Sequence, residues 1–100
     1  MKTKTITKMQ NLVKMMKSES ANVFRDIMCD KRGFQVVIGG PYGKTIKNAN
    51  YGISKYKDAI VIHDIGHQFD IGGMPHMTTT LYRDKYAVEM FDLLLANLAA

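Results

Sequence analysis

The residues of this chain best suited to catalysis follow its most strand-like segment. His63, Asp64 and His67 place two imidazoles and a carboxylate close together, and Asp70 and His76 follow within the next nine residues. Two histidines and a carboxylate can hold zinc or iron. One hypothesis is therefore a small metal-dependent hydrolase that uses His63, Asp64 and His67, although their spacing matches no compact metal-binding template.

The run Ile62-His63-Asp64-Ile65-Gly66-His67 resembles the metal-binding core of HD-type phosphohydrolases. In that family a His-Asp pair holds a divalent metal that activates water, which would make His63 and Asp64 ligands. The family also needs a histidine upstream and an aspartate downstream, on a larger all-helical domain. No histidine precedes His63 here, and the preceding residues favour a strand. Our leading interpretation therefore assigns no catalytic residue, no metal and no cofactor.

The segment Gly39-Gly40-Pro41-Tyr42-Gly43-Lys44-Thr45 resembles the phosphate-binding P-loop. That motif needs four residues between its two glycines, whereas three separate Gly39 from Gly43. It also needs a helix next, and residues 46–52 are poor helix formers. The pattern instead favours a glycine-rich hairpin, with short strands at 44–47 and 51–54.

Cations and tyrosines alternate through the middle of the chain, which suits contacts with phosphates and stacking on unpaired bases. The predicted contact residues are Lys31, Arg32, Tyr42, Lys44, Lys47, Tyr51, Lys55, Tyr56 and Lys57. The order helix, strands, helix is similar to that of double-stranded-RNA-binding domains. Their lysine cluster at the start of the last helix is reduced here to Arg83 and Lys85, beside Asp84. The alternative is a solvated hairpin face whose tyrosines pack on the sheet.

The charge is divided unevenly along the chain. Its net charge is +5, but residues 1–57 carry twelve Lys or Arg against three Asp or Glu, while residues 58–100 carry two against six. The first part is therefore +9 and the second −4. A basic half of this kind favours nucleic acid or an acidic protein surface as the partner.

Hydrophobic spacing predicts the elements around these residues. Apolar residues recur with helical period over 5–17, and a second short helix is expected from Ser20 or Asn22 to Met28, an edge strand being the alternative. β-branched residues predict strands over 34–38 and 58–64. The second of these is apolar on both faces, so we expect it to be central and covered on both sides.

The remaining residues predict a loop and a long helix. Residues 68–76 carry glycines and a proline and predict a loop, and Thr78 to Thr80 extend a strand or cap the next element. Residues 82–98 predict a helix that is apolar on most of its surface, which favours packing across the sheet and self-association. The predicted homodimer contacts are Phe91, Leu94, Leu95 and Leu98.

The chain length and the expected elements together predict one α+β domain spanning residues 1–100. It has an antiparallel sheet of three to five strands, one or two N-terminal helices and a long C-terminal helix. The single cysteine, Cys29, suits a reducing compartment. No apolar run approaches the ~20 residues of a membrane span, and the N-terminal lysines lack the apolar stretch of a secretory signal. We therefore expect a cytoplasmic protein without membrane contacts.

Three functions follow, in order of preference. The first is a non-enzymatic binding protein that contacts nucleic-acid phosphates through its basic half. The second is an inhibitor or adaptor, of the kind made by phages and mobile elements against CRISPR or restriction systems, that blocks an acidic or nucleic-acid-binding host protein. The third is the hydrolase at His63, Asp64 and His67.

Overall fold

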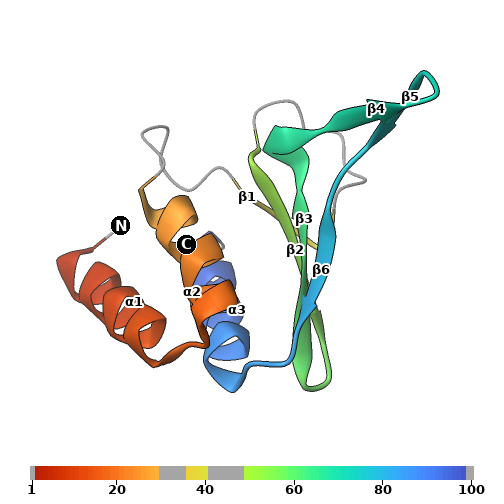
Figure 1. Cartoon of the computed structure of the whole chain (residues 1–100). Coiled ribbons are helices and arrows are strands. Elements are labelled where there is room, and N and C mark those ends of the chain that lie inside the picture. Colours follow the sequence, from red (N-terminus) through yellow and green to blue (C-terminus); the bar gives the residue numbers. More distant parts are fainter. Residues whose placement is uncertain (1, 30–35, 41–48, 99–100) are drawn as a thin grey trace.

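The computed structural model describes residues 2–29, 36–40 and 49–98. They form an α+β fold (Figure 1), which confirms the predicted class. The elements, in chain order, are α1 (Thr3–Met15), α2 (Ser18–Met28), β1 (Val36–Ile38), β2 (Tyr51–Tyr56), β3 (Ala59–Asp64), a 3₁₀ turn (Ile65–His67), β4 (Phe69–Ile71), β5 (Met74–His76), β6 (Thr79–Tyr82) and α3 (Lys85–Leu98). Among the helices described, none is long and apolar enough to cross a membrane.

The main sheet has the strand order β1-β2-β3-β6. Strands β2 and β3 are antiparallel, as are β3 and β6, but β1 pairs with β2 in parallel. The sheet is therefore mixed, where a purely antiparallel one was expected. A parallel pair needs a crossover of about a dozen residues, and twelve residues separate the end of β1 from the start of β2 in the sequence. The strand predicted at 44–47 lies outside the described residues, as do Phe34 and Gln35 of the strand predicted at 34–38.

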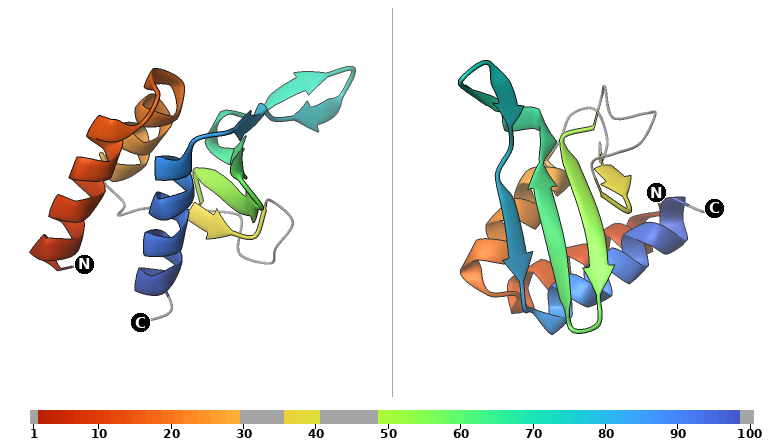
Figure 2. Two further views of the ribbon diagram at one scale, coloured as in Figure 1. Left: turned by 90° about the horizontal axis from the view of Figure 1, so that it is seen from below. Right: turned by 90° about the vertical axis from the view of Figure 1, so that its right-hand side faces the viewer.

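The described helices all lie on one face of this sheet, as Figures 1 and 2 show. Ile60 and Ile62 of β3 point toward the helices and are buried, whereas Val61 and His63 on the opposite face are only half-buried. Strand β3 is central, as predicted, because it pairs with both β2 and β6. The expectation that helices or strands cover both of its faces is wrong for the part of the chain described.

Each helix contributes an apolar stripe to the core. The buried stripes are Met9, Leu12 and Val13 of α1, Ala21, Phe24 and Ile27 of α2, and Ala87, Met90, Phe91 and Leu94 of α3. Helix α3 contacts α1 as well as β2 and β3, so an apolar surface on two sides of it is buried within one chain. It begins at Lys85, three residues later than predicted, because Tyr82 ends strand β6.

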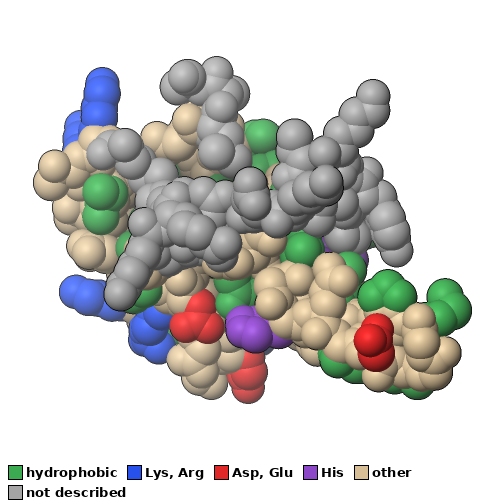
Figure 3. Space-filling model, turned by 90° about the horizontal axis from the view of Figure 1, so that it is seen from above, with side chains coloured by type: hydrophobic (Ala, Val, Ile, Leu, Met, Phe, Trp, Pro, Cys, Tyr) green, Lys and Arg blue, Asp and Glu red, His purple; other side chains and the backbone are tan. Residues whose placement is uncertain are grey.

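Strands β4 and β5 form a hairpin that projects from the body of the molecule (Figures 1 and 3). We call it the arm, residues 69–76. The prediction of a loop at residues 68–76 is therefore wrong. Gly72 and Gly73, at the turn, have φ angles of 59° and 83°. Two consecutive positive φ angles suit the tight turns that match the twist of paired strands, so the Gly-Gly pair was a hairpin signal in the sequence.

Candidate functional site

Three connections meet at the end of the molecule opposite the arm, at the bottom of Figure 1. They join α1 to α2, β2 to β3, and β6 to α3. Between them lies a hollow of about 490 Å³, which we call the cationic hollow. Its lining residues are Met15, Lys17, Asp58, Arg83, Asp84, Lys85 and Tyr86.

Asp84 holds two of these connections together. Its carboxylate accepts hydrogen bonds from the backbone N–H of Lys17 (2.8 Å), the hydroxyl of Ser20 (2.7 Å) and the backbone N–H of Tyr86 (3.0 Å). The residue is only 5% exposed. It caps the first turn of α3 and ties it to the start of α2, which satisfies backbone donors that have no partner within a helix.

The hydrogen bonds also determine the charge of Asp84. Burial alone would raise the pKa of its carboxyl, but the hydrogen bonds from Lys17, Ser20, Tyr86 and Ala87 outweigh burial and hold that pKa below the ordinary value. Asp84 is therefore ionised at neutral pH. The positive ends of the α2 and α3 helix dipoles lie beside this negative charge. The carboxylate therefore neutralises little of the positive charge on the exposed cations.

Those cations are Lys17, Arg83 and Lys85, and all three are exposed. The ammonium of Lys85 lies 5.0 Å from the centre of the Tyr86 ring, a cation–π distance. Asp58 is the exposed carboxylate of the lining. Exposed ammonium and guanidinium groups around one hollow suit phosphate oxygens, which Arg can bind in a bidentate manner.

Of the contact residues predicted from sequence, Tyr56 and Lys57 are exposed beside the hollow, at the turn that carries Asp58. Tyr51 is buried, with its hydroxyl hydrogen-bonded to Asp26. Burial and the neighbouring Asp26 and Asp64 carboxylates raise its pKa to about 12, so its ring cannot stack on a base. Lys55 forms an ion pair with Asp92 at 3.0 Å. The remaining predicted contact residues, Lys31, Arg32, Tyr42, Lys44 and Lys47, lie outside the described residues.

Sequence analysis did not predict that Lys17, Arg83 and Lys85 lie around one hollow. The directions of the strands offered a signal. Strands β2 and β6 both run antiparallel to β3, so both finish at the end of the sheet where β3 begins. The turn after β2 and the link after β6 must then be neighbours. The position of Lys17 had no such signal, since it depends on how α1 and α2 pack.

The residues of the hydrolase hypothesis point in different directions. His63 shares a 2.9 Å hydrogen bond with the hydroxyl of Thr79, while His67 donates a 2.9 Å hydrogen bond to Asp64. Successive residues of a strand face opposite sides of a sheet, so His63 and Asp64 are separated by the sheet itself. His76 stacks on Phe69 in the arm. Within the described residues, no three His, Cys, Asp or Glu side chains form a group that could hold a metal.

We expect His63 to make the protein less stable in mild acid. Burial lowers the pKa of its imidazole below 6.5, so the unfolded chain binds this proton more readily than the folded chain does. The contribution of His63 to the free energy of unfolding should be constant above pH ~7 and fall as pH drops through about 6.5. NMR titration should give a midpoint below 6.5 for His63, and His63→Gln should remove this part of the pH dependence. A midpoint at or above 6.5 would contradict the assignment.

The P-loop-like segment is partly described. Gly39 and Gly40 have φ angles of 104° and 109°, and the N–H of Gly39 donates to the carbonyl of Ile53 at 2.7 Å. A Cβ on Gly52 would lie 3.1 Å from the carbonyl carbon of Gly40. The two glycines therefore fold back on β2, while residues 41–45 lie outside the described part.

The residues predicted for self-association have different environments. Phe91 and Leu94 are buried in the core of their own chain, and Leu95 is exposed. The side chain of Leu98 lies outside the described part. A homodimer through this helix stays a prediction, but Phe91 and Leu94 would first have to leave the core.

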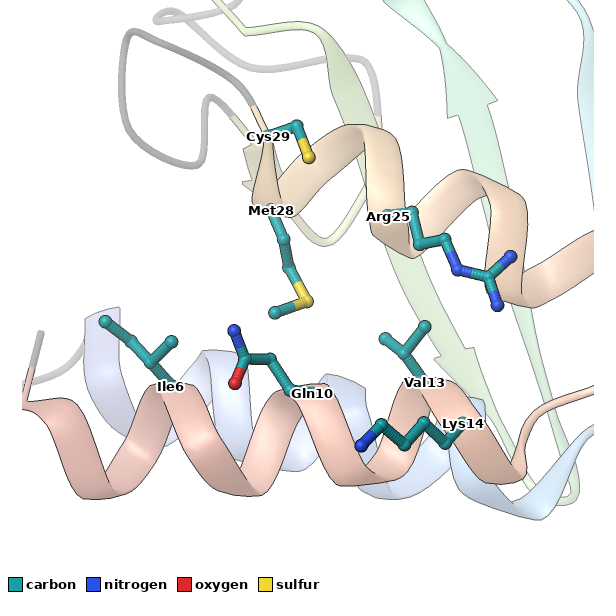
Figure 4. A pocket seen from close by; sticks show the side chains of 7 residues that line it. All are labelled: Ile6, Gln10, Val13, Lys14, Arg25, Met28 and Cys29. Carbon is teal, nitrogen blue, oxygen red and sulfur yellow. The ribbon is translucent and has the colours of Figure 1, made fainter.

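A second groove, of about 690 Å³, lies between α1 and α2 (Figure 4). Its lining residues are Ile6, Gln10, Val13, Lys14, Arg25, Met28 and Cys29. Among the described residues that line this groove, none is a histidine or carboxylate that could serve as a base for Cys29.

No protein-family model matches the chain, no curated protein matches it, and no solved structure matches it.

Proposed function

We propose that this is a non-enzymatic protein that binds nucleic acid by contacting backbone phosphates at the cationic hollow. The observation that carries the proposal is the convergence of Lys17, Arg83 and Lys85, which come from connections far apart in the sequence and are all exposed. Asp84 fixes the backbone beneath them by accepting hydrogen bonds from the N–H groups of Lys17 and Tyr86 and from the hydroxyl of Ser20. A preorganised set of cations loses less entropy when it binds a phosphate than a set on mobile chain ends.

The surroundings of the hollow extend the same chemistry. Exposed lysines continue along α1 at Lys4, Lys8 and Lys14, and the first acidic residue of the chain is Glu19. Figure 3, which views the molecule from the end opposite the hollow, shows Lys and Arg side chains on the helical side and none on the arm. Exposed Tyr56, next to Lys57, can stack on an unpaired base. Contacts of this kind attract the nucleic-acid backbone without reading its sequence.

The proposal is tested by titrating labelled single- and double-stranded oligonucleotides and following fluorescence anisotropy. Arg83→Glu should weaken binding at least about tenfold, because it replaces a phosphate contact by a repulsion. Lys55→Glu is the matched control, since it changes the net charge equally at an exposed residue that does not line the hollow, and should have a several-fold smaller effect. For three phosphate contacts on duplex DNA, log K should fall against log salt with a slope of about −3.

Equal losses in Arg83→Glu and Lys55→Glu would mean that net charge, and not the hollow, governs binding. No binding even at low salt would refute the nucleic-acid function.

The second candidate is an inhibitor or adaptor whose hollow docks on an acidic surface of a host protein. It is favoured by Met15 in the hollow and Tyr56 beside it, which are 56% and 61% exposed, because phosphate binding makes no use of an exposed methionine. This function predicts no oligonucleotide affinity. It also predicts a complex with one host protein that Arg83→Glu abolishes and Lys55→Glu does not.

A further inference from the structure

The arm has one apolar face without a partner among the residues that the structure describes. Cross-strand pairing sets Phe69 opposite His76 and Ile71 opposite Met74, and residues directly opposite share a face of a sheet. Asp70 and Pro75 are on the other face. All six strand residues are exposed, with Phe69, Ile71 and Met74 at 48%, 59% and 65%.

The uncovered face of the main sheet is a second apolar surface. Val61 of β3 pairs with Leu81 of β6 on that face, and Tyr56 lies two residues beyond Ser54, the partner of Val61 on β2. Leu81 is 49% exposed and Tyr56 61%. The arm leaves the sheet on the side away from the helices (Figures 1 and 2), so it projects beside this face.

Two further observations indicate what covers these surfaces. A two-stranded hairpin alone is marginally stable in water, so an arm with an exposed apolar face gains from a partner. Residues 58–82, which include the arm, β3 and β6, contain no Lys or Arg. Copies of a chain with net charge +5 repel each other most at their cationic ends. Residues 58–82 add no cation to that repulsion, and the cations nearest to the proposed interface are Lys55 and Lys57, on either side of Tyr56.

We propose that the partner is a second copy of this chain. Two copies exchange arms about a two-fold axis, and the apolar face of each arm covers Tyr56, Val61 and Leu81 of the other copy. One closed arrangement then buries both surfaces of both chains. The five large side chains expose roughly 100 Å² each, so the dimer covers about 1,000 Å², at the lower limit for a specific interface. The dimer is therefore weak and depends on concentration.

Sedimentation equilibrium over a wide concentration range tests the dimer. The average mass should rise from 11.3 kDa toward twice that value, and Met74→Asp should weaken the association at least about tenfold by burying an unpaired charge. Met15→Asp is the matched control, because Met15 is similarly exposed, at 56% against 65% for Met74, but lies at the cationic hollow. It should leave the association unchanged.

Disulfide trapping tests the geometry. A Cys29→Ser, Met74→Cys protein mixed with a Cys29→Ser, Leu81→Cys protein should form a cross-linked pair under mild oxidation, whereas neither protein should do so alone. A mass of 11.3 kDa at every concentration overturns the proposal. So does a dimer that Met74→Asp leaves intact, as pairing through the free edge of β6 would. Oligonucleotide binding measured on Met74→Asp tests the nucleic-acid function separately, because this monomer keeps Lys17, Arg83 and Lys85 and leaves Tyr56 uncovered.

Discussion

Asp84→Ala should lower the free energy of unfolding by about 3 kcal/mol, a large part of the stability of a small domain. The substitution leaves the N–H groups of Lys17 and Tyr86 and the hydroxyl of Ser20 without the acceptor they share. Loss of a helix cap typically costs about 1 kcal/mol. Leaving buried donors without a hydrogen-bond acceptor adds about 1–3 kcal/mol. The connection that carries Lys17 would also lose its attachment to the connection that carries Arg83 and Lys85. Oligonucleotide binding should therefore weaken in the folded fraction.

Urea denaturation followed by circular dichroism measures this loss. Asp84→Asn, which keeps one acceptor oxygen, should cost less than Asp84→Ala. Asp92→Ala, which removes an exposed ion pair with Lys55, should cost less than about 1 kcal/mol. A loss below 1 kcal/mol in Asp84→Ala would show that water replaces the carboxylate readily.

The depressed pKa of Asp84 gives this contribution a pH dependence. The stabilisation is fully present above the ordinary carboxyl pKa of about 4 and is lost as pH falls through the lower pKa of the folded chain. Asp84→Asn should therefore lose the part of the acid sensitivity that lies in this range.

Ile60→Ala should cost about 3–4 kcal/mol, whereas Val61→Ala, one residue along the same strand, should cost about 1 kcal/mol or less. Ile60 is completely buried beneath the helices, while Val61 lies half-buried on the uncovered face. Truncating Ile60 leaves a cavity that the packed helices cannot close. Truncating Val61 removes a side chain that already contacts water.

The comparison needs urea denaturation at low protein concentration, so that self-association does not stabilise either variant. Equal costs at Ile60 and Val61 would mean that both faces of β3 are covered within one chain. Unchanged denaturant slopes would show that neither substitution alters the surface exposed on unfolding.

Several features of the protein follow from its sequence alone. Apolar residues at helical spacing in α1 and α3 predict helices because one side of each must be removed from water. The β-branched run of β3 predicts a central strand, and its two neighbours confirm it. The Gly72-Gly73 turn was predictable as well, since its positive φ angles are a local property of glycine. All of these depend on interactions within a few residues of each other.

Only the tertiary structure decided which face of the sheet is covered and which side chains meet. Apolar residues on both faces of β3 look alike in sequence, whether a helix or a second molecule covers the second face. Tyr51 appeared available for stacking, but pairing with β1 and β3 places it in the core. His63 and Asp64 are adjacent in sequence and separated by the sheet. Lys17 and Arg83 are distant in sequence and share one hollow, because a buried carboxylate satisfies donors at the starts of two helices.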